Sequence, residues 1–339
     1  MKNFIWFVSI VLAFSAYSCQ EEEETVVQNT ADSFTKSEAI SSLIKRVSQN
    51  ETSGDNVLDN TSLFSVKLPV AVTVDGHNEV VNSSADYSEI QSIKDEHNYD
   101  NDIVYFAFPI TIVYPDFSVA VINNQNEFNA VSAGSDDDFH EINCIDFQYP
   151  FNINIYNTEN EVANTISLTT NSQLYNFVEE LLDAEIVGIV YPITLKKPNG
   201  QTFTITSNAE LEDTIDAAVD ECNVGTTVPE LHDILTDGNW RISYCYYDND
   251  ETSNFVGYDF TFSGNGNSGN VIAANSNFIN GEWEIENSGS EQTLKLHFDD
   301  NTLHDLESEW DVKEYTSTYV RLKREGSSNE YYYLSFTKN

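Results

Sequence analysis

The sequence predicts an α+β protein in which four strand-strand-helix repeats are followed by an all-β small antiparallel barrel. Prolines 69, 109, 150 and 192 stand at one position of the similar segments VKLPVAV, FAFPITI, FQYPFNI and IVYPITL, at spacings of 40, 41 and 42 residues, which indicates internal repetition. From about Val228 the helix patterns stop and short strand-like segments run to the end. A length of 339 residues suits two such regions, each with its own core.

Residues 1–18 are typical of a secretory signal peptide. A charged start with Lys2 precedes an apolar run over residues 4–14, which is too short to cross a bilayer core of about 30 Å as a helix. Two cleavage sites compete, an ordinary small-x-small site at residues 16–18 and a site directly before Cys19. The second resembles the lipobox of bacterial lipoproteins. It implies lipidation at Cys19 and a membrane anchor; the alternative is a secreted protein with an incidental cysteine.

Residues 19–33 are predicted to form an acidic flexible tether. Glutamates fill positions 21–24, and the following TVVQNTADS has no hydrophobic periodicity. The acidic run resembles the tag after the lipidated cysteine in surface-exported lipoproteins of Bacteroidetes-type bacteria. That resemblance implies an outer-membrane, lipid-anchored protein exposed at the cell surface. The alternative is a periplasm-facing protein whose charges only keep the tether solvated.

The composition excludes partners that are themselves anionic. The chain has 56 acidic and 15 basic residues, a formal net charge of −41, and no basic residue between Lys94 and Lys196. Such a charge repels nucleic acids, anionic lipid headgroups and sulfated glycans. The sequence therefore predicts no nucleic-acid partner, and membrane contact only through the N-terminal lipid. It does not identify a protein partner.

Residues 34–59 are predicted to form an amphipathic helix and a linker. Thr35 and Glu38 have the spacing of a capping box. The apolar stripe of the helix consists of Ile40, Leu43, Ile44 and Val47. Because one apolar face must be buried, we expect this helix to dock on the first repeat or on a partner.

Residues 60–227 are predicted to hold the four repeats. In each copy the residues one and three places after the proline are apolar, as in a half-buried strand. A hairpin turn follows, most clearly at Asp75-Gly76 and Asn199-Gly200, and then a second strand. A helix-capping pattern comes next in every copy. The capping pairs are Ser83 and Asp86, Asn124 and Glu127, Thr170 and Gln173, and Ser207 and Glu210.

The residue before the repeated proline admits two interpretations. Tyr149 and Tyr191 favour a platform on which a sugar ring stacks, but Phe108 and Leu68 occupy the same position in the other copies. A buried position tolerates such exchanges more readily than a binding position does, so a core role is the stronger interpretation. The proline lacks a backbone donor, and we expect it at a sheet edge or a bulge.

Three cysteines remain after Cys19, and they suit an oxidising compartment. Cys144 opens the third repeat and Cys222 closes the fourth, so a disulfide between them would join these repeats. Closing so long a loop would stabilise the fold by about 4 kcal/mol. The alternative is two reduced thiols in the core. Cys245 is then unpaired, in a setting unlike that of a catalytic thiol.

Eight short strands in residues 228–339 indicate a small antiparallel barrel or sandwich, of which we expect the barrel. A Gly-Asn-Trp sequence ending at Trp240 enters the first strand, and YVRLKR lies near the last. This pattern resembles the lipocalin-like domains at the C-termini of Bacteroidetes lipoproteins, which the repeats also resemble. In lipocalins a Gly-x-Trp motif and an arginine close one end of the barrel. The resemblance implies a plug in which Arg321 or Arg324 covers the indole of Trp240.

The sequence favours a non-enzymatic binding protein. A lipocalin-like barrel would hold a small apolar ligand or a neutral glycan in its mouth, with Trp283, Trp310 and Tyr244 as the candidate contacts. A second hypothesis is a structural or adhesion role, with the barrel filled by its own side chains. A hydrolase is a minor third, because Glu282 and Glu284 are expected on a solvated strand face rather than in a carboxylate pair.

No cofactor is expected, although two acidic segments suit calcium. Carboxylates cluster at Asp248, Asp250 and Glu251, and again at Asp136 and Asp138, in the oxygen-rich pattern that calcium prefers. Neither segment has the full spacing of a known calcium loop, so the alternative is two acidic turns. The histidines lack the spacing of a zinc motif.

Overall fold

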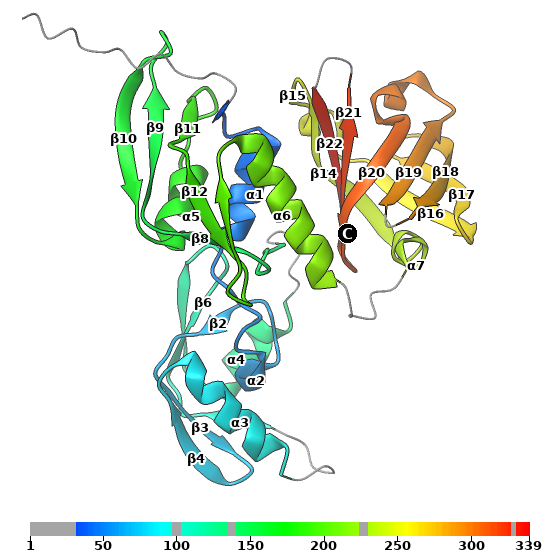
Figure 1. Cartoon of the computed structure of the whole chain (residues 1–339). Coiled ribbons are helices and arrows are strands. Elements are labelled where there is room, and N and C mark those ends of the chain that lie inside the picture. The colour runs from blue at the N-terminus through cyan, green and yellow to red at the C-terminus, as the bar shows by residue number, and fades with distance from the viewer. Residues whose placement is uncertain (1–31, 97–102, 135–139, 224–229, 290, 327–329) are drawn as a thin grey trace, which may run out of the picture.

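The structure is a computed structural model that describes residues 32–96, 103–134, 140–223, 230–289, 291–326 and 330–339. These residues form three bodies with separate hydrophobic cores: two mixed bodies of strands and helices, and a C-terminal barrel. In Figure 1 one mixed body lies below the other, and the barrel lies beside the upper one. No described helix has the length and apolar character needed to span a membrane.

The lower body comprises residues of the first two proline segments. Its elements are β2 (Ser65–Val66), β3 (Val70–Val74), β4 (His77–Val81), η2 (Ser84–Asp86), α3 (Tyr87–Lys94), β5 (Val104–Phe106), β6 (Ile110–Val113), β7 (Val119–Ile122) and α4 (Gln125–Ser132). The upper body contains β8 (Asp146–Gln148), β9 (Phe151–Tyr156), β10 (Val162–Leu168), α5 (Asn171–Glu179), β11 (Val187–Ile189), β12 (Ile193–Lys196), β13 (Thr202–Ile205) and α6 (Asn208–Asn223).

The two proline segments of each body exchange strands. β5, which precedes Pro109, pairs with β3, which follows Pro69; β2, which precedes Pro69, pairs with β6, which follows Pro109. In the upper body β8 pairs with β12 and β11 pairs with β9 in the same way. The hairpins therefore lie in four small sheets, and the segments are coupled in pairs.

Each of the four prolines follows a cis peptide bond at the point where the chain leaves one sheet and enters the next. The prolines therefore stand between two strands, and not at a sheet edge or a bulge as expected. Because they belong to no strand, the hydrogen bonds between strands do not need the N–H that proline lacks. The tyrosines before two of them are half-buried. The hydroxyl of Tyr149 donates to Asn171 at 2.8 Å and that of Tyr191 to Asn208 at 2.7 Å, which ties each ring to the start of a helix.

The helices begin where the capping patterns indicate. The side chain of Asn124 accepts hydrogen bonds from the first turn of α4, and that of Thr170 does the same for α5. Ser83 and Asp86 form a reciprocal capping box at η2. The first helix differs, because α1 (Ala39–Val47) has Glu38 as its N-cap residue, and the carboxylate of Glu38 accepts from the amide of Thr35 at 2.9 Å.

The helix α1 docks on the upper body, so the expected docking on the first repeat is wrong. Its apolar stripe joins the core of the upper body, where it contacts α5 and α6. The reason lies just before it: β1 (Ser33–Phe34) pairs with β11 and fixes this end of the chain to the upper body. The residues that follow α1 reach the lower body: the side chain of Asn50 donates to the carbonyl of Val113 at 3.2 Å, and Leu58 of α2 (Asn56–Asp59) joins the core of that body.

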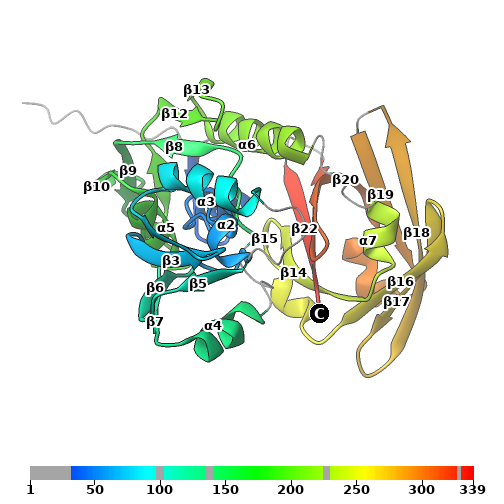
Figure 2. The same ribbon diagram turned by 90° about the horizontal axis from the view of Figure 1, so that it is seen from below.

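The C-terminal region is an eight-stranded closed antiparallel barrel, as predicted. It closes because β14 pairs with both β16 and β22. Its elements are α7 (Leu231–Leu235), β14 (Asn239–Tyr247), β15 (Asn249–Asp250), η3 (Thr252–Phe255), β16 (Asp259–Asn265), β17 (Ser268–Ala274), β18 (Phe278–Ser288), β19 (Glu291–Phe298), η4 (Asn301–Leu306), β20 (Ser308–Tyr315), β21 (Tyr319–Glu325) and β22 (Tyr331–Lys338). The short helix α7 lies across one end of the barrel (Figure 2), and its apolar residues join the barrel core.

Candidate functional site at the barrel junction

The interior of the barrel is filled by its own side chains. Trp240, Trp283 and Trp310 are each at most 2% exposed. Phe336 packs edge-on against Phe260 with ring centroids 5.4 Å apart. Trp283 and Trp310 are packed in the barrel core and are not, as the sequence had led us to expect, open to a ligand in the barrel mouth.

The predicted plug of Trp240 by an arginine does not form. The strand register places Trp240 opposite Lys338 at one end of β22, whereas Arg324 of β21 lies opposite Tyr332 near the other end of β22. The Arg324 guanidinium is 5.4 Å from the ring of Trp310 and so covers a different indole. Trp240 is held instead by α7, because its indole N–H donates to the carbonyl of Leu235 at 3.0 Å.

Arg321 points away from the barrel interior because neighbouring residues on a strand face opposite sides. The outer faces of β14, β20, β21 and β22 contact α6, α1 and the residues just before α1, and we call this contact the junction. Tyr244 lies in the junction, where its hydroxyl donates to the carbonyl of Ser37 at 2.7 Å. Burial raises its pKa above the usual value. The expectation that Tyr244 contacts a ligand in the barrel mouth is therefore wrong, because the residue lies outside the barrel.

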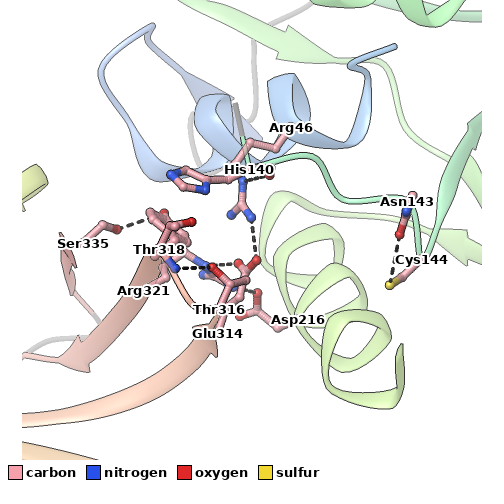
Figure 3. Close-up of polar contacts among 11 residues, drawn as sticks. Arg46, His140, Asn143, Cys144, Asp216, Glu314, Thr316, Thr318, Arg321 and Ser335 are labelled. Carbon is pink, nitrogen blue, oxygen red and sulfur yellow. Dashed lines mark hydrogen bonds and ion pairs between the residues drawn. The ribbon is translucent and has the colours of Figure 1, made fainter. Parts of the chain in front are cut away.

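A buried network of charges crosses the junction (Figure 3). Glu314 of β20 lies 2.6 Å from Arg46 of α1 and 3.4 Å from Arg321 of β21. Arg321 also pairs with Asp216 of α6. Burial alone would raise the pKa of Glu314. The facing guanidinium groups of Arg46 and Arg321 outweigh this effect and hold the pKa below its usual value. The network therefore stays charged and ties the barrel to both helices.

Two further contacts extend this network. Lys323 of β21 lies 3.0 Å from Glu212 of α6, which also accepts a hydrogen bond from the hydroxyl of Tyr333 at 3.0 Å. On the other side, the imidazole of His140 stacks on Tyr319 with centroids 4.0 Å apart, and the backbone carbonyl of His140 accepts from Arg46 at 2.7 Å. The junction is thus polar and closely paired.

This network was not predicted from the sequence, although β21 carries a signal for it. Arg321 and Lys323 alternate with Val320 and Leu322 on one strand, so both cations share the outward face. In a chain with only 15 basic residues, two cations on one strand face indicate that acidic side chains lie opposite. What the sequence does not reveal is which helix supplies them.

A cleft opens beside the network, between the start of α1, the start of α6 and the barrel. Its volume is about 380 Å³. Ala39, Ile40, Glu212 and Tyr333 are the buried residues in its lining, and Tyr331, which is 40% exposed, lies nearer its rim. We call this the junction cleft.

A second hollow, of about 600 Å³, lies on the outer face of β17, β18 and β19. Glu282 pairs with His297 across the strands and Glu284 with Lys295. Both glutamates are exposed, as expected of a solvated strand face. Lys295 bridges the carboxylates of Glu286 at 2.6 Å and Glu309 at 3.1 Å.

The cysteines fall in three different settings. A disulfide joins Cys144 to Cys222, with Cα atoms 6.1 Å apart, and links the start of the third proline segment to the end of the fourth. Cys245 is free and buried in the barrel core. Cys19, the predicted lipidation site, lies outside the described residues.

Of the carboxylates predicted as calcium ligands, those of Asp250 and Glu251 accept hydrogen bonds from residues of their own turn. Asp250 accepts from the amide of Thr252 at 2.9 Å, and Glu251 accepts from the side chain of Asn254. Asp248 adopts a left-handed backbone conformation with φ of 58°. Asp136 and Asp138 lie outside the described residues. Among the residues that are described, no group of three or more His, Cys, Asp or Glu side chains is placed to hold a metal ion.

Comparisons with known proteins leave the geometry as the guide to function. No protein-family model, no curated protein and no solved structure matches the chain.

Proposed function

We propose that the protein is a non-enzymatic structural or adhesion lipoprotein that contacts other proteins at the surface of the cell. The filled interior of the barrel carries this proposal. Three indoles and the rings of Phe260, Phe262 and Phe336 occupy the space in which a ligand-binding barrel would hold its ligand. This packing favours a structural role over the hypothesis of an apolar ligand or glycan in the barrel mouth.

The junction supports the same role. Binding modules that open around a ligand need an interface that separates easily. Here Arg46, Glu314 and Arg321 are each less than a tenth exposed, and Glu314 pairs with both arginines. Separating the barrel from the upper body would leave these charged groups without their partners, which is costly. The barrel and the upper body are therefore suited to act as one rigid unit, which the N-terminal tether would hold at the cell surface.

We further propose that the four proline segments are copies of one strand-strand-helix unit. Three features support common origin: the spacing of the prolines, the recurrence of a hairpin and a helix after each, and the reciprocal strand exchange within each pair. Two copies would form the smallest stable body, because each hairpin takes its third strand from the other copy.

A ligand titration tests the filled barrel. Apart from Trp6, the tryptophans all lie in the barrel region, so their emission reports on its interior. We expect no saturable change in emission when palmitate, retinol or maltohexaose is added to the folded chain. A saturable shift with one of these probes that is absent from the urea-unfolded chain would overturn the proposal.

The anchor and its orientation need a separate test in the bacterium. We expect metabolic labelling with an alkyne fatty acid to modify the wild-type chain and not the Cys19→Ala variant. External protease should then remove the protein from intact cells if it faces outward. Labelling of Cys19→Ala equal to wild type would contradict the anchor, and protection from protease in intact cells would contradict surface exposure.

A further inference from the structure

The junction cleft combines aromatic rings with carboxylates at the meeting point of the upper body and the barrel. We propose that it is a binding site for small organic cations, that is, an amine or a quaternary ammonium group on a short apolar body. The inference does not depend on the structural role proposed above, since the cleft lies outside the barrel interior.

The protein's own ammonium group shows what the rings can accept. The Nζ atom of Lys323 lies 4.0 Å from the ring centroid of Tyr331 and 5.6 Å from that of Tyr333. Its remaining partner is the carboxylate of Glu212 at 3.0 Å. A third ring, that of Tyr246, stands edge-on to Tyr333 at 6.4 Å. Rings arranged in this way attract cations through their negative faces, most strongly where water is partly excluded.

The charges in the cleft exceed what this lysine neutralises. Glu38, Asp248 and Glu330 line the cleft together with Glu212, and none of its lining residues is basic. Among the described residues, no Lys, Arg or His forms an ion pair with Glu38, Asp248 or Glu330. Burial, together with the nearby charges of Glu38 and Asp248, raises the pKa of Tyr246, so those two carboxylates act at the aromatic ring.

The remaining surface of the cleft fits a ligand with an apolar part. Ala39 and Ile40 are buried among its lining residues, and both are at most 8% exposed. A volume of about 380 Å³ lies at the lower end of the range for small-molecule sites. A cation with a few carbon atoms therefore matches the cleft in size, polarity and charge, whereas an anion of the same size would be repelled by the carboxylates in its lining.

Calorimetric titration of the full chain in a nonionic detergent with choline chloride tests the proposal, with sodium chloride at equal ionic strength as the blank. We expect saturable binding with a Kd on the order of 1 mM or tighter. Tyr331→Leu removes one ring and should weaken binding about fivefold, whereas Tyr331→Phe keeps the ring and should bind like wild type. Tyr331 is 40% exposed, so either variant is expected to fold.

Two charge variants separate local from general electrostatics. Asp248→Asn removes a carboxylate from the cleft and should weaken choline binding about threefold, and asparagine tolerates the left-handed backbone at this position. Glu284→Gln removes an exposed carboxylate from the outer hollow of the barrel and should leave the affinity unchanged. Absence of saturable binding to the wild type, or equal affinities in all four variants, would overturn the proposal.

Discussion

Glu314 on β20 accepts a hydrogen bond at 2.6 Å from Nη2 of Arg46 on α1, and this contact joins the barrel to the upper body. The two side chains are 8% and 6% exposed. The same carboxylate faces Arg321 at 3.4 Å, and Asp216 supplies the second negative charge for these two buried cations. Because a buried ion pair adds little net stability but is costly to break, the contact fixes how the two bodies are oriented more than it adds to the free energy of unfolding.

Removal of this carboxylate should destabilise the protein strongly. Glu314→Gln leaves Arg46 buried without a counter-charge, and we expect a loss of about 3 kcal/mol in the free energy of unfolding by urea denaturation. Glu309→Gln is the matched control, since Glu309 is on the same strand and 71% exposed; its effect should stay within about 0.5 kcal/mol. Equal unfolding midpoints for the two variants would show that the junction pair is not important for stability.

The barrel core offers a second pair of matched variants. Phe336 is fully buried between Phe260 and Phe262, whereas Phe278 is 79% exposed. We expect Phe336→Ala to lower the free energy of unfolding by about 3–5 kcal/mol through the cavity it leaves, and Phe278→Ala to change it by less than about 0.5 kcal/mol. Urea denaturation followed by tryptophan emission measures both. A small effect of Phe336→Ala would mean that the interior is loosely packed and has room for a ligand.

The sequence predicted those features that depend on local pattern. The barrel strands were found because apolar and polar residues alternate along them, and the capping pairs because N-cap chemistry extends over only four residues. Register is different, since it depends on which residues of distant strands lie opposite each other. The plug prediction for Trp240 failed for that reason: Arg324 pairs near the end of β22 that is far from Trp240, and Arg321 faces outward.

The junction could not be predicted because its partners are far apart in the chain. Arg46 and Glu314 are separated by 268 positions, and no local pattern relates them. The docking of α1 was missed for the same reason, as an amphipathic stripe indicates that a helix is covered without indicating by what. The strand exchange between paired segments likewise joins strands that are not neighbours in sequence.

The disulfide gives a third prediction, which combines a thiol count with a stability measurement. Cys144 and Cys222 close a loop with a sequence separation of 78, and in the chain-entropy treatment this stabilises the folded state by about 4 kcal/mol. For a chain beginning at residue 25, thiol titration in denaturant should detect one group before reduction, Cys245, and three after it. Reduction should lower the urea midpoint of wild type but not of a Cys144→Ser, Cys222→Ser double variant. Three thiols before reduction would contradict the bridge.

Two buried carboxyl groups near α2 lead to a prediction about pH. Asp55 and Asp59 are at most 8% exposed, and each leaves one oxygen without a hydrogen-bond partner. Burial raises the pKa of Asp55 to about 6, and burial together with the charge of Asp55 raises the pKa of Asp59 to about 8. Glu51 and Glu141 add negative charge near Asp55, and Lys94 partly offsets it near Asp59.

A raised pKa means that the folded chain holds these protons after the unfolded chain has released them. Between the unfolded value near 3.8 and the folded value near 8 for Asp59, the folded state binds more protons, so the free energy of unfolding falls as the pH rises through this window. Asp59→Asn cannot ionise, and we expect its loss of stability from pH 5 to pH 8.5 to be smaller than that of wild type by on the order of 2 kcal/mol. Urea midpoints at both pH values measure this difference. Glu89→Gln, on the exposed side of α3, is the control and should follow wild type. If Asp59→Asn shows the same pH dependence as wild type and Glu89→Gln, the slope comes from the overall negative charge of the chain and not from this buried carboxyl group.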